Sequence, residues 1–247
     1  MKNFHQLIAE ISEYFIITAV LALPPLFVPH QTGVVLHVPS LGALLFYMAA
    51  ALFLFLRARS TQSAFPALNT VEPDAEFRRK AAAKRATSAV LSFAARLLLC
   101  FCALACSAAL WNRIAAFAGE NAVHAALPDE AGRRFLLFSG IIILACYEEM
   151  LYRFFLPEKA RRIVSLVFSN PDSAHVLRMF YALAEFIPMC LFALAHRYLG
   201  IYAVGNALCA AVILRTAFCK KVSIFALCAV HAAYNAAMLI ALFNTAQ

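Results

Sequence analysis

The chain has 247 residues, of which 64% are hydrophobic and only 14% are charged, and its mean hydropathy is +0.79. A soluble domain carries about a quarter charged residues and about half apolar ones, so this composition excludes a water-soluble globule. The net charge is +8. Because the Lys and Arg residues collect in short segments beside apolar runs, membrane orientation accounts for them. We therefore expect the lipid bilayer as a partner and no nucleic acid.

A helix that crosses a bilayer needs about 20 mostly apolar residues, and signals for strands are absent. The sequence therefore predicts an all-α, polytopic membrane protein of about seven transmembrane helices. The seven apolar runs, in chain order, are 11–29, 41–57, 88–111, 135–157, 176–196, 198–216 and 221–244. We divide the chain into 1–134, the N-terminal helices with a basic cytoplasmic loop, and 135–247, the C-terminal transmembrane core.

Three features along the chain qualify this outline. Pro24 and Pro25 should kink the first run, which we interpret as a retained helix and not a signal peptide. The loop 58–87 is long and basic, and its stretch 72–85 suits either a short interfacial helix or a solvated connector. His196 and Arg197 alone separate the fifth and sixth runs, which predicts a tight or re-entrant connection.

The basic residues also predict an orientation. With the N-terminus inside, the inner segments carry fourteen Lys and Arg residues and the outer segments carry four. Positively charged residues accumulate on the cytoplasmic side of membrane proteins. We therefore expect a multi-pass protein of the cell membrane with a cytoplasmic N-terminus. The eight cysteines lie in or beside apolar runs without CxxC spacing, which predicts free thiols.

Charged groups inside a membrane helix are costly and therefore suggest function, and the fourth run contains three. Residues four apart share a helix face, so Glu149 can form an ion pair with Arg153. Glu148 lies about 100° around the helix and has no such partner on its own helix. We expect the pair to be structural and Glu148 to be available for chemistry.

Two further helices carry polar residues one turn from a second group. The fifth run ends with Phe192 and His196, and the seventh holds His231 and Asn235. Each pair alone is more typical of hydrogen bonding between helices than of catalysis. Glu185 has no companion motif, so we expect it at most to support other groups. A free carboxylate, two imidazoles and a carboxamide in one small membrane protein nevertheless favour a catalytic site.

Three short patterns thus occur in order, each in a predicted membrane helix: EExxxR at 148–153, FxxxH at 192–196 and HxxxN at 231–235. Together they resemble the CAAX prenyl protease and bacteriocin-processing (CPBP) intramembrane endopeptidases, which include the type II CAAX prenyl endopeptidases and abortive-infection-like proteins. The resemblance covers about residues 135–244. It implies a membrane endopeptidase, of the kind also described as a glutamic protease, that acts on a membrane-tethered peptide such as a CAAX-like or leader sequence.

The resemblance also implies roles for individual residues. Glu148 would be the general base, and His196 would help it to hold and deprotonate a water molecule. His231 and Asn235 would donate hydrogen bonds to the oxyanion. Glu149 and Arg153 would brace the helix, with Phe192 as structural support for His196. No metal is expected in this reading.

Two alternatives stay open. Two histidines and a glutamate can ligate zinc with water in the fourth position, which would make the protein a zinc-dependent membrane protease. A non-catalytic scaffold or immunity factor, or a proton-coupled transporter, would use the same polar groups differently. The predicted topology also places His196 nearer the outer surface than Glu148 and His231. The three side chains can meet only if the fifth helix is kinked or begins deeper.

Overall fold

The chain folds into helices throughout the residues that the computed structural model describes, which are 2–29, 38–62, 75–119, 128–168 and 174–244, and these contain no strand. In an apolar environment an α-helix satisfies its backbone N–H and C=O groups internally, and long runs of Ala, Leu and Phe supply the lipid-facing surface. The predicted all-α class is therefore confirmed.

The described residues form twelve helical elements. In chain order they are α1 (Lys2–Ile17), η1 (Thr18–Ala22), η2 (Pro24–Phe27), α2 (Leu41–Gln62), α3 (Ala75–Phe117), α4 (Ala131–Glu148), η3 (Glu149–Phe155), α5 (Leu156–Val167), α6 (Ala174–Ala195), η4 (Arg197–Leu199), α7 (Ile201–Cys219) and α8 (Ile224–Asn244). The segments η1 and η3 are π-helical, whereas η2 and η4 are 3₁₀ turns. The turn η4 is the tight connection that the sequence predicted.

Seven helical stretches of the described residues are long and apolar enough to cross a membrane, so the predicted number of spans is confirmed. The fourth stretch, Ala131–Val167, joins α4, η3 and α5. The first stretch is Phe4–Ala22, which corrects the predicted run 11–29. The helix ends earlier because Pro24 and Pro25 have no N–H groups with which to continue it.

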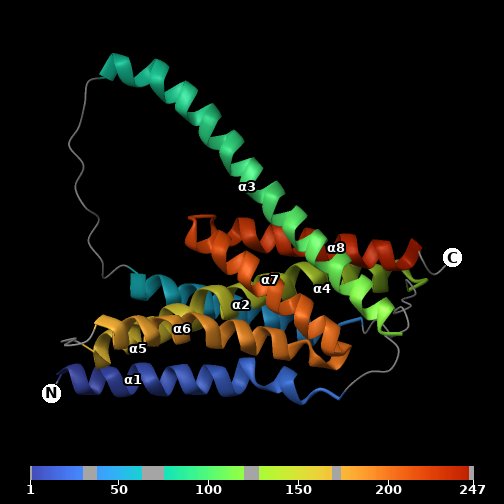
Figure 1. Cartoon of the computed structure of the whole chain (residues 1–247), viewed down its shortest axis with the longest axis horizontal. Helices are drawn as coiled ribbons and strands as arrows, with labels where there is room; N and C mark the ends of the chain where they lie inside the picture. Colours follow the sequence, from blue (N-terminus) through green and yellow to red (C-terminus); the bar gives the residue numbers. More distant parts are fainter. Residues whose placement is uncertain (1, 30–37, 63–74, 120–127, 169–173, 245–247) are drawn as a thin grey trace.

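Most helices run side by side along the long axis of the molecule, while α3 crosses them obliquely and its N-terminal end leads away (Figure 1). Helices of the N-terminal part pack directly on the C-terminal part, in the pairs α1 with α5, α2 with α4, and α3 with α7. From Ala75 onward, the predicted 72–85 segment is continuous with α3 and does not form a separate helix. Residues 63–74 lie outside the described residues.

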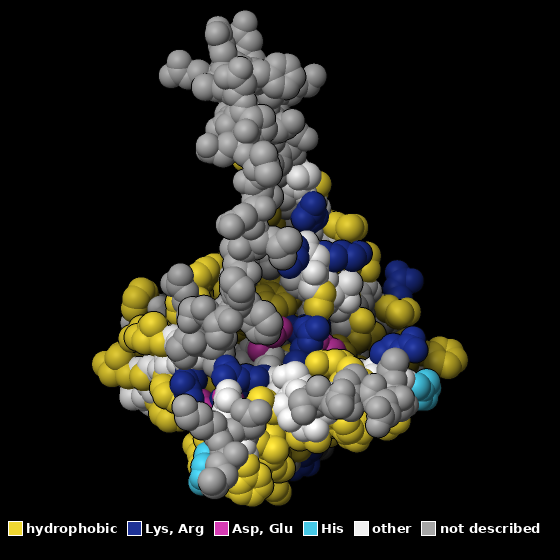
Figure 2. All heavy atoms as spheres, turned by 90° about the vertical axis from the view of Figure 1, so that its left-hand side faces the viewer, with side chains coloured by type: hydrophobic (Ala, Val, Ile, Leu, Met, Phe, Trp, Pro, Cys, Tyr) yellow, Lys and Arg dark blue, Asp and Glu magenta, His cyan; other side chains and the backbone are white. Residues whose placement is uncertain are grey.

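Charged residues are unevenly distributed between the ends of this bundle. Figure 2 shows Lys and Arg side chains, with a few carboxylates among them, on the end that faces left in Figure 1. Arg57 at this end forms an ion pair with Glu13, and Lys159 binds both Glu10 and Glu13. The apolar sides and the basic end match the arrangement expected for a protein oriented in a membrane.

Close helix contacts depend on residues without a side chain. A Cβ atom on Gly205 of α7 would overlap the indole ring of Trp111 on α3, and one on Gly140 of α4 would lie 2.7 Å from Cγ of Pro39. Small residues allow membrane helices to approach closely. Asn206, next to Gly205, adds polar contacts, because it accepts a hydrogen bond from Ser107 at 2.9 Å and donates one to Tyr234 at 3.1 Å.

Replacing Gly205 with alanine should therefore destabilise the bundle by about 1–3 kcal/mol, the usual cost of overpacking. Thermal unfolding of the purified protein in detergent measures the effect. Gly132→Ala is the matched control, because a Cβ there would meet no atom within 4 Å. Equal unfolding temperatures for the two variants would contradict the tight α3–α7 contact.

Candidate active site

The two adjacent acids lie at the point where the fourth membrane span changes helix type. The α-helix α4 ends at Glu148, and the π-helical segment η3 begins at Glu149, with all seven of its residues buried. Glu149 is 0% exposed, whereas the side chain of Glu148 is 21% exposed. Single π-helical turns inside α-helices frequently occur at functional sites. Here the turn separates a buried acid from an accessible one.

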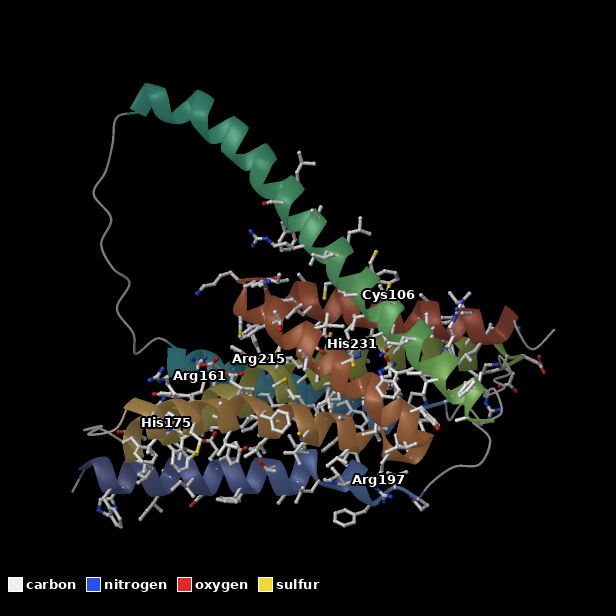
Figure 3. All side chains as sticks on the ribbon, viewed as in Figure 1. Cys106, Arg161, His175, Arg197, Arg215 and His231 are labelled. Carbon is white, nitrogen blue, oxygen red and sulfur yellow. The ribbon has the colours of Figure 1, made fainter. Side chains whose placement is uncertain are left out.

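His231 of α8 lies between these carboxylates, in the interior of the bundle (Figure 3). Its Nδ1 is 2.8 Å from Oε1 of Glu149, and its Nε2 is 3.7 Å from Oε2 of Glu148. Since ionised Glu149 can only accept a hydrogen bond, Nδ1 carries the proton and donates it to Glu149. A carboxylate bound in this way orients an imidazole and leaves its other nitrogen for chemistry.

Arg153 balances the charge of the buried acid. Its Nε lies 3.5 Å from Oε1 of Glu149, and its side chain is 1% exposed. The guanidinium nitrogens have no hydrogen-bond partner within the described structure. The guanidinium instead stacks against the Phe192 ring, whose centroid lies 3.6 Å from Cζ of Arg153. An aromatic face attracts a cation. The ion pair expected from the i,i+4 spacing is thus present, with an aromatic ring as its second contact.

Phe192 connects the two histidines. Its ring centroid lies 4.7 Å from that of His196 and 6.2 Å from that of His231. Nδ1 of His196 donates to the Phe192 carbonyl at 2.9 Å, because a carbonyl oxygen can only accept, and Nε2 is then the acceptor nitrogen of that ring. The contact between Phe192 and His196 that the sequence suggested is therefore accompanied by a backbone hydrogen bond.

The depth of His196 relative to His231 can be judged from Phe192, whose ring contacts both histidines, and from the stagger of the helices. In Figure 1, α6 begins nearer the basic end than α8, so its end lies level with the middle of α8. Pro188 does not interrupt α6. Tyr198, in the turn η4 that follows His196, is also close to the acids. Burial and, after it, the negative charge of Glu148 raise the pKa of the Tyr198 phenol.

Asn235 lies one turn beyond His231 on α8 and is partly buried. Within the described residues, its carboxamide makes no hydrogen bond to another site residue. Its place in the site rests on the helix that it shares with His231, and its role stays a prediction.

Sequence reasoning missed the part played by Arg215. Arg215 is one of the fourteen basic residues assigned to the inner segments, yet it is only 4% exposed. Its guanidinium binds both carboxylate oxygens of Glu185, at 2.5 and 2.7 Å, and donates to the carbonyl of Arg153 at 2.5 Å. Arg161 reaches Glu185 at 3.4 Å, and Figure 3 places Arg161 beside Arg215. Glu185 therefore holds the arginine that binds the η3 backbone, a link for which the sequence carried no motif.

An apolar groove of about 470 Å³ lies between α4 and α8 beside these groups. Phe138, Ile142 and Phe225 are among its walls, and Cys146 and Cys228 also line it. Each cysteine precedes a site residue by about one turn: Cys146 precedes Glu149, the first residue of η3, and Cys228 precedes His231 on α8. The apolar groove therefore comes within about one helical turn of the buried acid.

Comparison with known families gives one match. Residues 131–237 match the model of the type II CAAX prenyl endopeptidase Rce1-like family, and this confirms the family resemblance that the three motifs indicated. The matched segment contains all seven candidate site residues and indicates a multi-pass membrane endopeptidase of the CAAX type. No curated protein and no solved structure matches the chain significantly.

Removing one partner of a buried ion pair leaves an uncompensated charge, which costs about 3–5 kcal/mol. We therefore expect Arg153→Gln to lower the free energy of unfolding by this amount, measured by denaturant unfolding in detergent. Arg133→Gln is the control, because Arg133 pairs with Glu130 on the same helix while 65% exposed, and exposed pairs contribute little. A loss in Arg133→Gln as large as that in Arg153→Gln would contradict the distinct role of the buried pair.

Proposed function

We propose that the protein is an intramembrane endopeptidase in which Glu148, assisted by His196, activates the attacking water. The observation that carries this proposal is the position of His231, bound through Nδ1 to Glu149 and facing Glu148 through Nε2 at 3.7 Å. One acid is thereby engaged in holding the imidazole, while the more accessible acid remains next to its reactive nitrogen.

The reaction follows from these positions. Glu148 accepts a proton from water, and Nε2 of His196 accepts the second hydrogen bond of that water. As the oxygen attacks the scissile carbonyl, the amide of Asn235 donates a hydrogen bond to the developing oxyanion, and His231 donates a second one when its Nε2 also carries a proton. Glu148 then returns its proton to the leaving amine. Preorganised donors are most effective where bulk water is excluded, and a largely buried site inside a membrane bundle provides this condition.

The distribution of Lys and Arg residues suggests how the protein is oriented in the membrane. We propose that the N-terminus and the basic end of the bundle in Figure 2 face the cytoplasm of a cell-membrane protein. The positive-inside tendency supports this orientation. The substrate class proposed from the family match is a membrane-tethered peptide with a CAAX-like or leader-type sequence.

Glu148→Gln should lower the cleavage rate by about 10²–10⁴-fold, because the variant keeps the size of the side chain and loses the general base. The assay is cleavage of a library of membrane-tethered peptides, prenylated and unprenylated, by purified protein, with products identified by mass spectrometry. Glu130→Gln, the same change at an exposed position next to α4, should retain the wild-type rate.

Either of two outcomes contradicts the proposal. Wild-type activity in Glu148→Gln would show that this carboxylate is not the base. Absence of cleavage by folded wild-type protein across the library would favour a scaffold, an immunity factor or a proton-coupled transporter.

The metal-free mechanism has its own test. No group of three or more His, Cys, Asp or Glu side chains in the described part of the chain is arranged to hold a metal ion. We expect cleavage to persist after treatment with a strong zinc chelator, and elemental analysis to find much less than one zinc per chain. Stoichiometric zinc, removed together with activity and restored by added zinc, would establish the zinc-dependent alternative.

A further inference from the structure

The double proline that ends the first span leaves two backbone carbonyls of η1, at Leu21 and Ala22, as acceptors inside the protein. The carbonyl of Leu21 would normally bond to a backbone N–H three to five residues later. Pro24 and Pro25 have no N–H, and the N–H of Leu26 donates to Leu23 at 2.9 Å. The Ala22 carbonyl has no donor at Pro25, which lacks an N–H, or at Leu26, whose N–H is bound to Leu23. Leu21 is 8% exposed and Ala22 is 0% exposed, so these carbonyls need partners from elsewhere in the protein.

Two tyrosines from the site supply those partners. The hydroxyl of Tyr147 donates to the Leu21 carbonyl at 3.0 Å, and that of Tyr152 donates to the Ala22 carbonyl at 3.4 Å. Tyr147 directly precedes Glu148, and Tyr152 lies between Glu149 and Arg153. In a regular α-helix, residues five apart diverge by about 140°. The i→i+5 pattern of the π-helical turn brings them closer to one side, where both reach α1.

The tyrosines also contact other helices that frame the site. The Tyr147 ring lies 4.9 Å from that of Tyr47 on α2, and the Tyr152 ring lies 5.5 Å from that of Phe192 on α6. Both tyrosines are at most 5% exposed. Their hydroxyl groups are thus held by carbonyls of η1. Their rings pack against Tyr47 and Phe192, and Phe192 in turn contacts both histidines.

A second set of contacts fixes α1 beyond the π-helical turn. Lys159 on α5 forms ion pairs with Glu10 and Glu13, and Arg162 pairs with Glu10 at 3.0 Å. The first span is therefore bound to the fourth span at two places: η1 binds Tyr147 and Tyr152, and α1 binds α5 beyond η3. The guanidinium of Arg197, in η4 beyond His196, donates to the carbonyl of Leu26, and Figure 3 shows Arg197 beside the end of α1.

From these contacts we propose that the N-terminal segment from α1 to η2, which lies outside the segment matched by the family model, completes the active site. Its proline-broken end presents the Leu21 and Ala22 carbonyls, and through them Tyr147 and Tyr152 act as positioning residues for Glu148 and Glu149. This inference rests on the proposed role of Glu148. A small displacement of a catalytic group can reduce turnover by up to about 10²-fold, so the loss of either hydroxyl should lower kcat while leaving KM nearly unchanged.

Tyr147→Phe tests this directly, because it removes one hydroxyl and keeps the ring. We expect kcat to fall by about 10–100-fold, with KM within about twofold. Tyr202→Phe is the control, since that ring packs against Trp111 at 6.5 Å and away from the acids. Pro25→Ala provides the second arm, because residue 25 then gains an N–H that can bond to the Leu21 carbonyl and displace Tyr147.

A variant that combines Pro25→Ala with Tyr147→Phe shows whether the two substitutions act through the same contact or independently. If the two residues act through the same carbonyl, Pro25→Ala should lower kcat by itself, and adding Tyr147→Phe should cause little further loss. Additive losses, or a kcat of Tyr147→Phe within twofold of wild type, would overturn the proposal. So would a loss explained wholly by a smaller folded fraction, with kcat per folded molecule unchanged.

A readout independent of cleavage separates this proposal from the proposed function. Amide hydrogen exchange of residues 147–155 should be faster in Tyr147→Phe than in wild type and unchanged in Tyr202→Phe, and unchanged exchange in both would overturn the proposal. If Glu148→Gln abolishes cleavage while Tyr147→Phe is fully active, the endopeptidase assignment stands and the positioning role fails. If exchange rises as expected but Glu148→Gln cleaves normally, α1 holds this segment for another function.

Discussion

The site depends on the buried hydrogen bond from Nδ1 of His231 to Glu149. A carboxylate with no exposed surface is tolerated inside a membrane bundle only with compensating partners. His231 supplies a donor at 2.8 Å and Arg153 supplies the opposite charge at 3.5 Å. With Glu149 engaged in this way, its neighbour Glu148 lies beside Nε2 of the same imidazole. The different surroundings of the two adjacent acids follow from this one contact, and the different roles that we propose for them rest on it.

Side chains of neighbouring helices bind backbone carbonyls in and near the two π-helical segments. Arg215, bound to Glu185, donates to the carbonyl of Arg153 in the π-helical segment. Tyr147 donates to a carbonyl that the prolines of α1 leave without a backbone donor. Each of these two carbonyls thus accepts a hydrogen bond from a side chain of another helix. The arrangement explains how a π-helical turn persists where a regular α-helix would otherwise be preferred.

Much of the fold and part of the site could be predicted from the sequence. Seven spans followed from apolar length alone, and the i,i+4 spacings placed Arg153 near Glu149 and Phe192 near His196. Contacts between helices could not be predicted in the same way, because spacing along one helix says nothing about register against another. The stagger of α6 against α8, which brings His196 level with the site, is of this kind. So are the burial of Arg215 and the link from α1 to Tyr147, for which the double proline was the only signal.

The central claim is that Glu148 activates water for direct attack, and isotope labelling in a single turnover tests it most directly. Excess enzyme would cleave one peptide identified in the library in water enriched in ¹⁸O, and mass spectrometry would locate the label. The account predicts one ¹⁸O atom in the new carboxylate of the peptide product and none in Glu148. Label in the Glu148 side chain would show that it attacked the peptide as a covalent nucleophile, and would contradict the role that the structure supports.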